Sequence, residues 1–290
     1  MTRIAPTRFR LGDRMVSRAG YGAMQLTGPG VFGPPADRDA AIAVLRTAIE
    51  LGVDHIDTAQ YYGPDVVNEL IRDALHPYAA ELAIVSKVGV RRGKRGEILL
   101  YNEPAQLRTG IEDNLRTLRI HRLAAVNLRM PDDTALPDAR FDDQLAAMVQ
   151  ARQDGLIDAV GLSNVSLAQL EHALTITDIA TVQNSYSLAD RRSQAVLELT
   201  AERGISFAPY LPLGWPGRTR LQTLDSPVVR DIAERVGGTP PQVALAWLLS
   251  LAPNVLLIAG TRSTQHLREN TAALEIELTP EDRAALNALA

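Results

Sequence analysis

The 290-residue chain contains no cysteine and very little lysine. Without cysteine there are no disulfides, no thiolate nucleophile and no cysteine-based metal site, and the composition is typical of a cytoplasmic protein. Only Lys87 and Lys94 are lysines, and the remaining 28 of the 30 basic residues are arginines. Because this chain uses arginine for nearly every cation, each lysine is a candidate for a specific role of its ammonium group.

Long hydrophobic runs are absent as well. No stretch approaches the roughly 18 consecutive apolar residues that a membrane helix needs, and the first ten residues, MTRIAPTRFR, hold no apolar segment of the kind found in secretory signals. The formal net charge of −4 gives no general attraction to nucleic acids or anionic membranes. We therefore expect neither a membrane nor a nucleic acid as a partner.

What the sequence does contain is a regular alternation of short apolar segments and helical patterns. Strands are predicted at Arg18–Tyr21, His55–Asp57, Leu82–Ser86, Ala124–Leu128, Ala159–Gly161, Thr181–Gln183, Ile205–Ala208 and Val255–Ile258. Helices are predicted at Arg38–Leu51, Val66–Leu75, Pro104–Leu118, Asp142–Asp154, Leu167–Ile176, Ser193–Arg203 and Pro240–Leu251. Eight strands, each followed by a helix or a long loop, favour an α/β fold, a closed (β/α)8 TIM barrel. We expect one domain over residues 1–290.

Four segments do not fit this repeat. Arg8–Val16, which contains Gly12-Asp13, is predicted to form an N-terminal β-hairpin that caps the N-terminal face of the barrel. Val31–Asp37, with two prolines, and Val90–Asn102, rich in basic residues, are predicted loops. Pro216–Leu224 is assigned to the loops on weaker grounds.

Polar side chains lie at the ends of consecutive predicted strands, where the catalytic groups of such barrels are found. Asp57 ends the second strand, Tyr62 follows it, and Lys87 ends the third. A phenol titrates near ~10, but an adjacent ammonium lowers its pKa, and a carboxylate holds the ammonium in place. Each residue alone has an ordinary interpretation as a helix cap, a packing residue or a surface cation. Together they predict a tyrosine that acts as a proton donor.

The same three residues belong to longer motifs. Residues 57–63 read DTAQYYG and residues 85–89 read VSKVG. The first resembles the aldo-keto reductase signature Asp-Thr-Ala-x-x-Tyr-Gly, and the second resembles that family's lysine segment. Similar segments follow in family order over nearly the whole chain: LSN at 162–164, VQNSY at 182–186, PYLPLG at 209–214 and residues 260–270. The resemblance implies that Tyr62 gives a proton to an aldehyde, that Lys87 lowers the pKa of Tyr62, and that Asp57 orients Lys87.

The fourth strand carries the departure from the family pattern. It reads AVNLRMP over residues 125–131, and Arg129 stands where most members have a histidine. None of the five histidines of this chain fits that role. The segment nevertheless resembles the bacterial pyridoxal reductase branch, as do GYGAMQLTGPGVFGPP at 20–35 and HLREN at 266–270. Because arginine stays protonated, Arg129 is predicted to orient a carbonyl or to stabilise an anionic oxygen, and not to deliver a proton.

The resemblance also implies the contacts of the cofactor, NADPH or NADP+. Gly260-Thr261-Arg262-Ser263 leaves the eighth strand and opens a helix, whose N–H groups and positive end suit a phosphate. Arg262, with Thr261 and His266, would hold the 2′-phosphate. The other predicted contacts are Gly22, Ala23, Met24, Asp57 and Gly260; Ser163, Asn164 and Gln183 at the nicotinamide carboxamide; Tyr210, which stacks on the nicotinamide, with Leu211 and Leu213 in the same loop; and Glu269 and Asn270, which face the adenine. No Gly-x-Gly-x-x-Gly follows a strand, so a Rossmann mode is not indicated, and no metal is expected.

The sequence thus predicts an NADPH-dependent reduction of an aldehyde to an alcohol, with pyridoxal reduced to pyridoxine as the leading case. Two alternatives stay open at this stage. One is a reductase of the same mechanism with another aldehyde or ketone substrate. The other is an NADPH-binding regulatory subunit of the same fold, as the potassium-channel β subunits resemble this family, although the intact Asp57, Tyr62 and Lys87 disfavour a loss of catalysis. The sequence does not reveal the oligomeric state.

Overall fold

The fold is known from a computed structural model, which describes residues 7–215 and 217–289. The strands are β1 (Arg8–Leu11), β2 (Arg14–Ser17), β3 (Tyr21–Gly22), β4 (His55–Asp57), β5 (Ala83–Arg92), β6 (Ile98–Tyr101), β7 (Ala125–Arg129), β8 (Val160–Ser163), β9 (Thr181–Gln183) and β10 (Ser206–Phe207). The α-helices are α1 (Arg38–Glu50), α2 (Val66–Leu75), α3 (Pro104–Leu118), α4 (Ala139–Gln153), α5 (Leu167–Ile176), α6 (Gln194–Arg203), α7 (Arg218–Leu224), α8 (Pro227–Val236), α9 (Pro240–Leu251), α10 (Thr264–Ala272) and α11 (Pro280–Asn287). Short 3-10 helices lie at η1 (Ala23–Leu26), η2 (Pro29–Val31) and η3 (Ala273–Glu275). In the part of the chain so described, no helix has both the length and the apolar character needed to cross a membrane.

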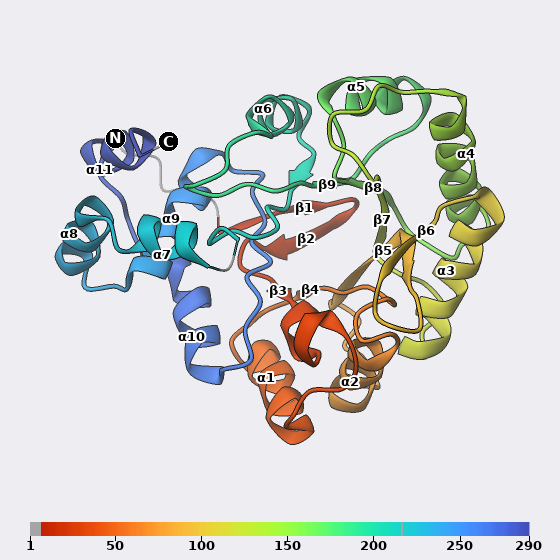
Figure 1. The fold of residues 1–290 in the computed structure, drawn as a ribbon, viewed down its shortest axis with the longest axis horizontal. Coiled ribbons are helices and arrows are strands. Elements are labelled where there is room, and N and C mark those ends of the chain that lie inside the picture. The colour runs from red at the N-terminus through yellow and green to blue at the C-terminus, as the bar shows by residue number, and fades with distance from the viewer. Residues whose placement is uncertain (1–6, 216, 290) are drawn as a thin grey trace.

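The strands form a closed parallel ring with the helices around its outside (Figure 1). Neighbouring strands follow the order β10-β9-β8-β7-β5-β4-β3. Single parallel bridges from Phe207 to Val255 and from Ala19 to Leu257 place the segment after α9 between β10 and β3. The predicted eighth strand, Val255–Ile258, therefore occupies its expected position, although isolated bridges rather than a ladder hold it there. The prediction of a (β/α)8 barrel is confirmed.

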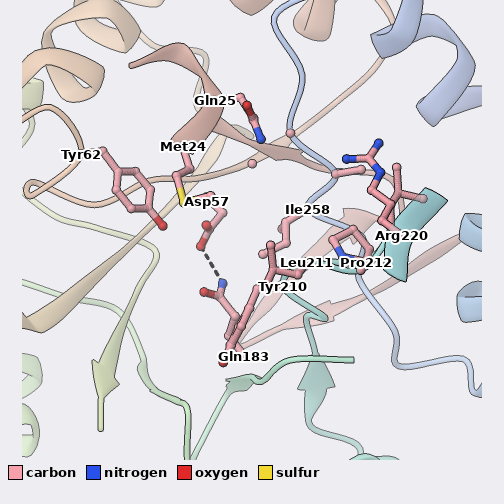
Figure 2. A pocket seen from close by; sticks show the side chains of 15 residues that line it. Met24, Gln25, Asp57, Tyr62, Gln183, Tyr210, Leu211, Pro212, Arg220 and Ile258 are labelled. Carbon is pink, nitrogen blue, oxygen red and sulfur yellow. Dashed lines mark hydrogen bonds between the residues drawn. The ribbon is translucent and has the colours of Figure 1, made fainter. Parts of the chain in front are cut away.

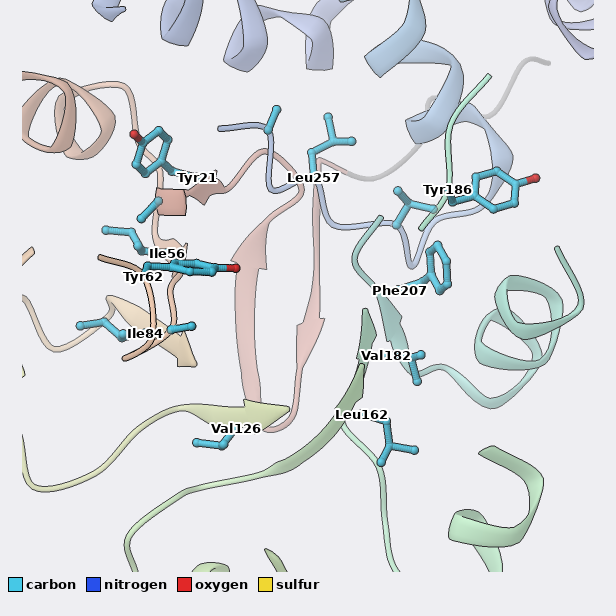
Figure 3. Packing of buried hydrophobic residues seen from close by; sticks show 14 of the residues in the cluster. Tyr21, Ile56, Tyr62, Ile84, Val126, Leu162, Val182, Tyr186, Phe207 and Leu257 are labelled. Atoms are coloured by element: carbon cyan, nitrogen blue, oxygen red, sulfur yellow. The ribbon is translucent and has the colours of Figure 1, made fainter. Parts of the chain in front are cut away.

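Successive residues of the barrel strands face opposite sides of the sheet. One side is an apolar layer between strands and helices, which includes Ile56, Val126, Leu162, Val182 and Leu257 (Figure 3). The residue after each of these apolar positions points to the other side, into the barrel. Because β4 and β7 end on such inward positions, their last side chains reach the mouth of the barrel. This alternation is what brings polar groups from distant parts of the sequence together.

The N-terminal hairpin β1–β2 closes the opposite end of the barrel. Leu11 and Val16 of the hairpin are buried in a second apolar cluster with Ala83, Ala125 and Ala159, which lie at or just before the starts of three barrel strands. Arg8 pairs with Ser17 and Leu11 with Arg14 across the hairpin. The predicted cap is therefore confirmed. It leaves the carboxyl ends of the strands as the open face.

Arg18 stabilises the seam of the barrel, where segment 255–257 meets β3. Its side chain is 1% exposed, and burial lowers its pKa to about 10. The guanidinium donates hydrogen bonds to the carbonyl oxygens of Leu249 (2.6 Å), Ala252 (2.7 Å) and Val255 (3.1 Å). These carbonyls belong to the end of α9 and to the segment that completes the ring. One buried cation therefore satisfies backbone acceptors on the far side of the seam from β3.

The loop predictions were partly wrong. Residues 90–102 do not form a plain loop, because β5 continues to Arg92 and pairs antiparallel with β6, Val90 opposite Leu100 and Arg92 opposite Ile98. The basic residues of this segment concealed the alternation of a hairpin. In the region assigned as Pro216–Leu224, residues 218–224 form helix α7, and Pro216 lies outside the described residues, as do residues 1–6 of the N-terminal segment.

Four predicted helices, α2, α3, α5 and α9, have the observed bounds, and α1, α4 and α6 differ by one to three residues at their ends. Helices α8 and α11 were not predicted. Both carry a readable start signal, since Ser226 and Thr279 are N-caps whose side chains accept hydrogen bonds from Val229 N–H and Asp282 N–H, and a proline follows each. These capping residues could have been recognised in the sequence, but the spacing of apolar residues alone did not indicate the two helices.

Candidate active site

Asp57 and Lys87 form a buried ion pair at the open end of the barrel. Asp57 is the last residue of β4, and Lys87 lies on the neighbouring strand β5. Lys87 Nζ donates to Asp57 Oδ1 at 2.6 Å and to the carbonyl oxygen of Thr58 at 2.9 Å. Each of the two charged residues is only 4% exposed. A buried charge is tolerated when it is paired and hydrogen-bonded, and here both conditions hold.

The other oxygen of Asp57 is held from across the barrel. Gln183, the last residue of β9, donates a hydrogen bond from Nε2 to Asp57 Oδ2 at 2.8 Å, the dashed line in Figure 2. Asp57 therefore has one donor on each oxygen. One donor comes from β5, the neighbour of β4, and the other from β9, which lies across the ring. This fixes the carboxylate more firmly than the pair with Lys87 alone would.

Tyr62 lies over this pair in the loop between β4 and α2. Lys87 Nζ is 5.0 Å from the centroid of the Tyr62 ring, so the ammonium faces the aromatic surface. Tyr61 packs edge-on against the same ring, with centroids 5.3 Å apart. Burial and the Asp57 carboxylate raise the pKa of Tyr62, whereas Arg129 and Arg92 lower it. The balance keeps the phenol protonated at neutral pH, the form that a proton donor requires.

Arg129 ends β7 and stands beside Tyr62 without a carboxylate partner. Its guanidinium forms no ion pair and no hydrogen bond with any described residue. Its backbone is fixed by Gly89, where φ is +119° and where an added Cβ would lie 2.5 Å from the Arg129 carbonyl oxygen. Glycine is required there both for that conformation and for the close approach. Arg129 is thus a cation at a fixed backbone position with no acidic partner among the described residues.

A pocket opens between β3, the end of β4 and the loop after β10. Its empty space is about 680 Å³, counting the open mouth. The lining residues are Gly22, Met24, Gln25, Asp57, Tyr62, Gln183, Tyr210, Leu211, Pro212, Leu213, Gly214, Arg220, Ile258, Ala259 and Gly260. Figure 2 shows Tyr62 and Met24 on one side, Gln183 and Tyr210 below, and Arg220 at the far end. The pocket is therefore elongated, with the proposed proton donor near one end and a cation at the other.

The predicted cofactor residues fall into two groups. Those that line the pocket are Gly22, Met24, Asp57, Gln183, Tyr210, Leu211, Leu213 and Gly260. Those outside its lining are Ala23, Ser163, Asn164, Thr261, Arg262, His266, Glu269 and Asn270. Ala23 and Ser163 are buried, whereas Arg262 and His266 are exposed around the start of α10. Of the predicted nicotinamide contacts, Gln183 and Tyr210 thus line the cavity, whereas Ser163 and Asn164 do not. The predicted phosphate contacts Arg262 and His266 lie on the surface.

Gly22 and Gly260 allow two backbone segments to pack closely where the barrel closes. An added Cβ on Gly22 would lie 2.3 Å from the carbonyl oxygen of Ile258, and one on Gly260 would lie 2.5 Å from the carbonyl oxygen of Gly22. The two backbones therefore touch, and neither position can carry a side chain. Just beyond Gly260, Ser263 caps α10 by accepting a hydrogen bond from His266 N–H. Both glycines line the pocket, and the positive end of α10 follows Gly260 closely in the chain.

Asn164 and Tyr210 are already engaged with each other. Asn164, in a left-handed conformation with φ of +58°, accepts a hydrogen bond from the Tyr210 hydroxyl at 2.9 Å. Its Nδ2 donates to the carbonyl oxygen of Met130 at 2.9 Å. Each polar end of the Asn164 side chain therefore has one partner, and one N–H and one lone pair remain for a ligand. Gln183 Oε1 has no hydrogen-bond partner among the described residues.

Comparison with known proteins decides the family. The model of the aldo/keto reductase family matches residues 18–290. The chain is an aldo/keto reductase. It is 47% identical over 283 residues, 97% of each chain, to the pyridoxine 4-dehydrogenase of Escherichia coli strain K12. It is 34% identical over 278 residues, 96% of this chain and 88% of the other, to an uncharacterized oxidoreductase of Schizosaccharomyces pombe.

Solved structures of aldo/keto reductases have the same fold as this chain. An aldo/keto reductase from Klebsiella pneumoniae, crystallised in complex with NADP and acetate, superimposes with a TM-score of 0.82 at 27% identity. The match covers 98% of this chain and 95% of that one. A thermostable aldo-keto reductase in complex with the inhibitor epalrestat also has a TM-score of 0.82, at 29% identity and over 98% of this chain and 99% of the other. The fold of this aldo/keto reductase thus matches theirs over nearly the whole of each chain.

Three polar side chains at the site of this aldo/keto reductase were not predicted from its sequence. Gln25 and Arg220 line the pocket. Arg92, the last residue of β5, lowers the pKa of Tyr62 as a second cation beside Arg129. Gln25 is the neighbour of the predicted Met24, so the motif that named Met24 could have named it as well. Arg92 and Arg220 lay in segments assigned to loops, and no signal separated them from the many other arginines.

Proposed function

We propose that this aldo/keto reductase reduces pyridoxal to pyridoxine with NADPH and that Tyr62 is the proton donor. The observation that carries the proposal is the convergence of Tyr62, Asp57 and Gln183 on one pocket, with Lys87 paired to Asp57 beneath the tyrosine ring. The name of the E. coli relative, pyridoxine 4-dehydrogenase, supports the choice of substrate. The NADP complex of the K. pneumoniae neighbour supports the choice of cofactor.

The residues present fit NADPH. Gly22 and Gly260 line the pocket without a side chain, and α10 begins at Thr264, shortly after Gly260. Arg262 is exposed there and makes no ion pair with any described residue, so it is available to the 2′-phosphate. Arg220, at the far end of the pocket, suits the pyrophosphate. Gln183, Ser163 and Asn164 would bind the carboxamide, and Tyr210 would stack on the nicotinamide.

The protein groups then act as follows. NADPH supplies a hydride when it is bound. Tyr62 holds its proton because burial and Asp57 raise its pKa, and it releases that proton to the oxygen that gains negative charge. Lys87, fixed by Asp57 and by the Thr58 carbonyl, keeps a positive charge against the ring as the phenolate forms. The low exposure of Lys87 and Asp57 strengthens this electrostatic effect.

Arg129 supports pyridoxal in particular. Pyridoxal carries a ring hydroxyl beside its aldehyde, and this hydroxyl ionises to an anionic oxygen. The Arg129 guanidinium is unpaired among the described residues and can donate two parallel hydrogen bonds, which an imidazole cannot. A planar cation at the end of β7 therefore suits an aldehyde with an acidic neighbouring oxygen better than a plain one.

The test is oxidation of NADPH against a panel that contains pyridoxal, benzaldehyde, an aliphatic aldehyde and a ketone. The proposal expects consumption of NADPH with pyridoxal, with pyridoxine as the product identified by chromatography, at a higher kcat/KM than with the other compounds. A higher kcat/KM for another compound would replace pyridoxal as the substrate. Binding of NADPH with no turnover of any compound would instead point to the regulatory subunit.

A further inference from the structure

Gln183 forms a hydrogen bond to Asp57 that binding of the cofactor carboxamide does not require. Its Nε2 donates to Asp57 Oδ2 at 2.8 Å, although the two residues are 126 positions apart in the chain. The orientation of the amide follows from chemistry, because an ionised carboxylate only accepts hydrogen bonds and would repel Oε1. Gln183 is 2% exposed and lines the pocket, and its Oε1 has no partner among the described residues. One amide therefore faces both the buried ion pair and the pocket.

The contact continues a chain of interactions toward Tyr62. Asp57 accepts a hydrogen bond from Gln183 on one oxygen and from Lys87 on the other. Lys87 in turn lies against the Tyr62 ring. We infer that Gln183 is a positioning residue that couples docking of the nicotinamide carboxamide to the placement of Asp57 and Lys87 beneath Tyr62. The inference rests on the proposed function, since it takes the carboxamide as the ligand of Gln183 Oε1.

The other predicted carboxamide residues lack this connection. Asn164 is bonded to Met130 and to Tyr210, and not to Asp57. Ser163 is 2% exposed at the end of β8 and has no side-chain bond to any described residue. Of the three, only Gln183 touches both the pocket and the ion pair. Ser163 is thus a matched control, since it shares the proposed ligand but not the bond to Asp57.

The sign of the effect follows from the charge on Asp57. That carboxylate raises the pKa of Tyr62. If the Gln183 N–H is removed, the negative charge on Asp57 is less neutralised and disfavours the phenolate further. Reduction needs the protonated phenol, so the alkaline fall of activity should move to higher pH when Gln183 is lost.

The first experiment uses Gln183→Met, which keeps the length of the side chain and removes the amide. The pH dependence of kcat/KM for an aldehyde that the wild type reduces should shift upward by about half a unit to one unit, less than the 1–3 units of a direct charge contact. Ser163→Ala should weaken NADPH binding while its pH profile stays at the wild-type position. Equal profiles for Gln183→Met and the wild type would overturn the inference.

A second substitution covers the case in which Gln183→Met fails to fold, as judged by circular dichroism. Gln183→Glu keeps the volume of the side chain and places a carboxylate against Asp57. Two carboxylates in hydrogen-bond contact share a proton, and this disturbs the charge beside Lys87 strongly. A pH profile of Gln183→Glu identical to that of the wild type would count against the coupling as firmly as the first result.

A binding measurement does not depend on turnover. Calorimetric dissociation constants are measured over a pH series for NADP+ and for its 3-acetylpyridine analogue, in which an acetyl group without N–H replaces the carboxamide. In the wild type the two ligands should show different pH dependence, because only the carboxamide can donate to Gln183 Oε1. In Gln183→Met this difference should vanish, whereas in Ser163→Ala it should persist. Persistence of the difference in Gln183→Met would refute the coupling, and this holds even if no aldehyde is reduced and the proposed function fails.

Discussion

Lys87 meets Tyr62 across the face of its ring, with Nζ 5.0 Å from the ring centroid, while its hydrogen bonds go to Asp57 and to Thr58. The position of the ammonium is therefore set by its buried partners and not by the phenol hydroxyl. The hydrogen bonds that hold Lys87 thus do not involve the tyrosine.

Removing the Tyr62 hydroxyl should stop catalysis and leave the cofactor site intact. We expect Tyr62→Phe to lower kcat by roughly 10²–10⁴, the range typical of a lost general acid. Its dissociation constant for NADPH, measured by fluorescence, should stay within about twofold of the wild type, since the ring and its contacts are kept. A Phe variant with more than about a tenth of the wild-type kcat would indicate a different proton donor.

Arg262 should govern the preference for NADPH over NADH. Charge-assisted bonds to a phosphate are the strong class of hydrogen bond, but the guanidinium here is exposed and screened. Arg262→Ala should raise the dissociation constant for NADPH roughly tenfold and leave that for NADH almost unchanged. Arg268→Ala, an exposed arginine on α10 with no assigned contact, is the control. Equal losses for both cofactors would exclude Arg262 from the 2′-phosphate site.

Arg129→His separates two roles of the cation at the end of β7. If Arg129 selects substrates with an acidic oxygen beside the carbonyl, the loss on pyridoxal should correspond to about 2–5 kcal/mol, while benzaldehyde is reduced as well as before or better. If Arg129 only lowers the pKa of Tyr62, activity on both aldehydes should fall by a similar factor. The alkaline limb of the pH profile should then move to higher pH, because the pKa of Tyr62 is no longer lowered. Ratios of kcat/KM for the two substrates over a pH series decide between these outcomes.

Arg18 should be a residue of stability and not of catalysis. Arg18→Met would leave the carbonyls of Leu249, Ala252 and Val255 without their buried donor, at a cost on the order of 3–5 kcal/mol. By the usual scaling this lowers Tm by roughly 10 °C. Arg14→Met, which breaks a half-exposed pair with Asp158 at 3.3 Å, should change Tm very little. Similar melting curves for the two variants would contradict the role given to Arg18.

The sequence was informative where function lies at strand ends. Asp57, Lys87 and Arg129 could be placed because a barrel gathers the carboxyl ends of its strands, so a position along each strand suffices. The bond between Gln183 and Asp57 could not be foreseen, since it depends on side-chain reach across the barrel between residues 126 positions apart. Arg92 was missed for a different reason. Its strand β5 continues beyond the barrel as a hairpin, and the run of basic residues concealed that pairing.

The seam of the barrel has a thermodynamic consequence. The segment 255–257 is joined to β3 and β10 by single bridges, so local opening of the sheet should begin there and not along the continuous ladders of β5, β7 and β8. Gly22 and Gly260 lie on the two sides of this seam and both line the pocket, so a cofactor in the pocket would touch both. Hydrogen exchange at the amides of Gly20 and Leu257, which bond across the seam to Leu257 and Arg18, should therefore slow when NADPH is added. Binding of the cofactor would therefore stabilise the closed form of the sheet at this segment.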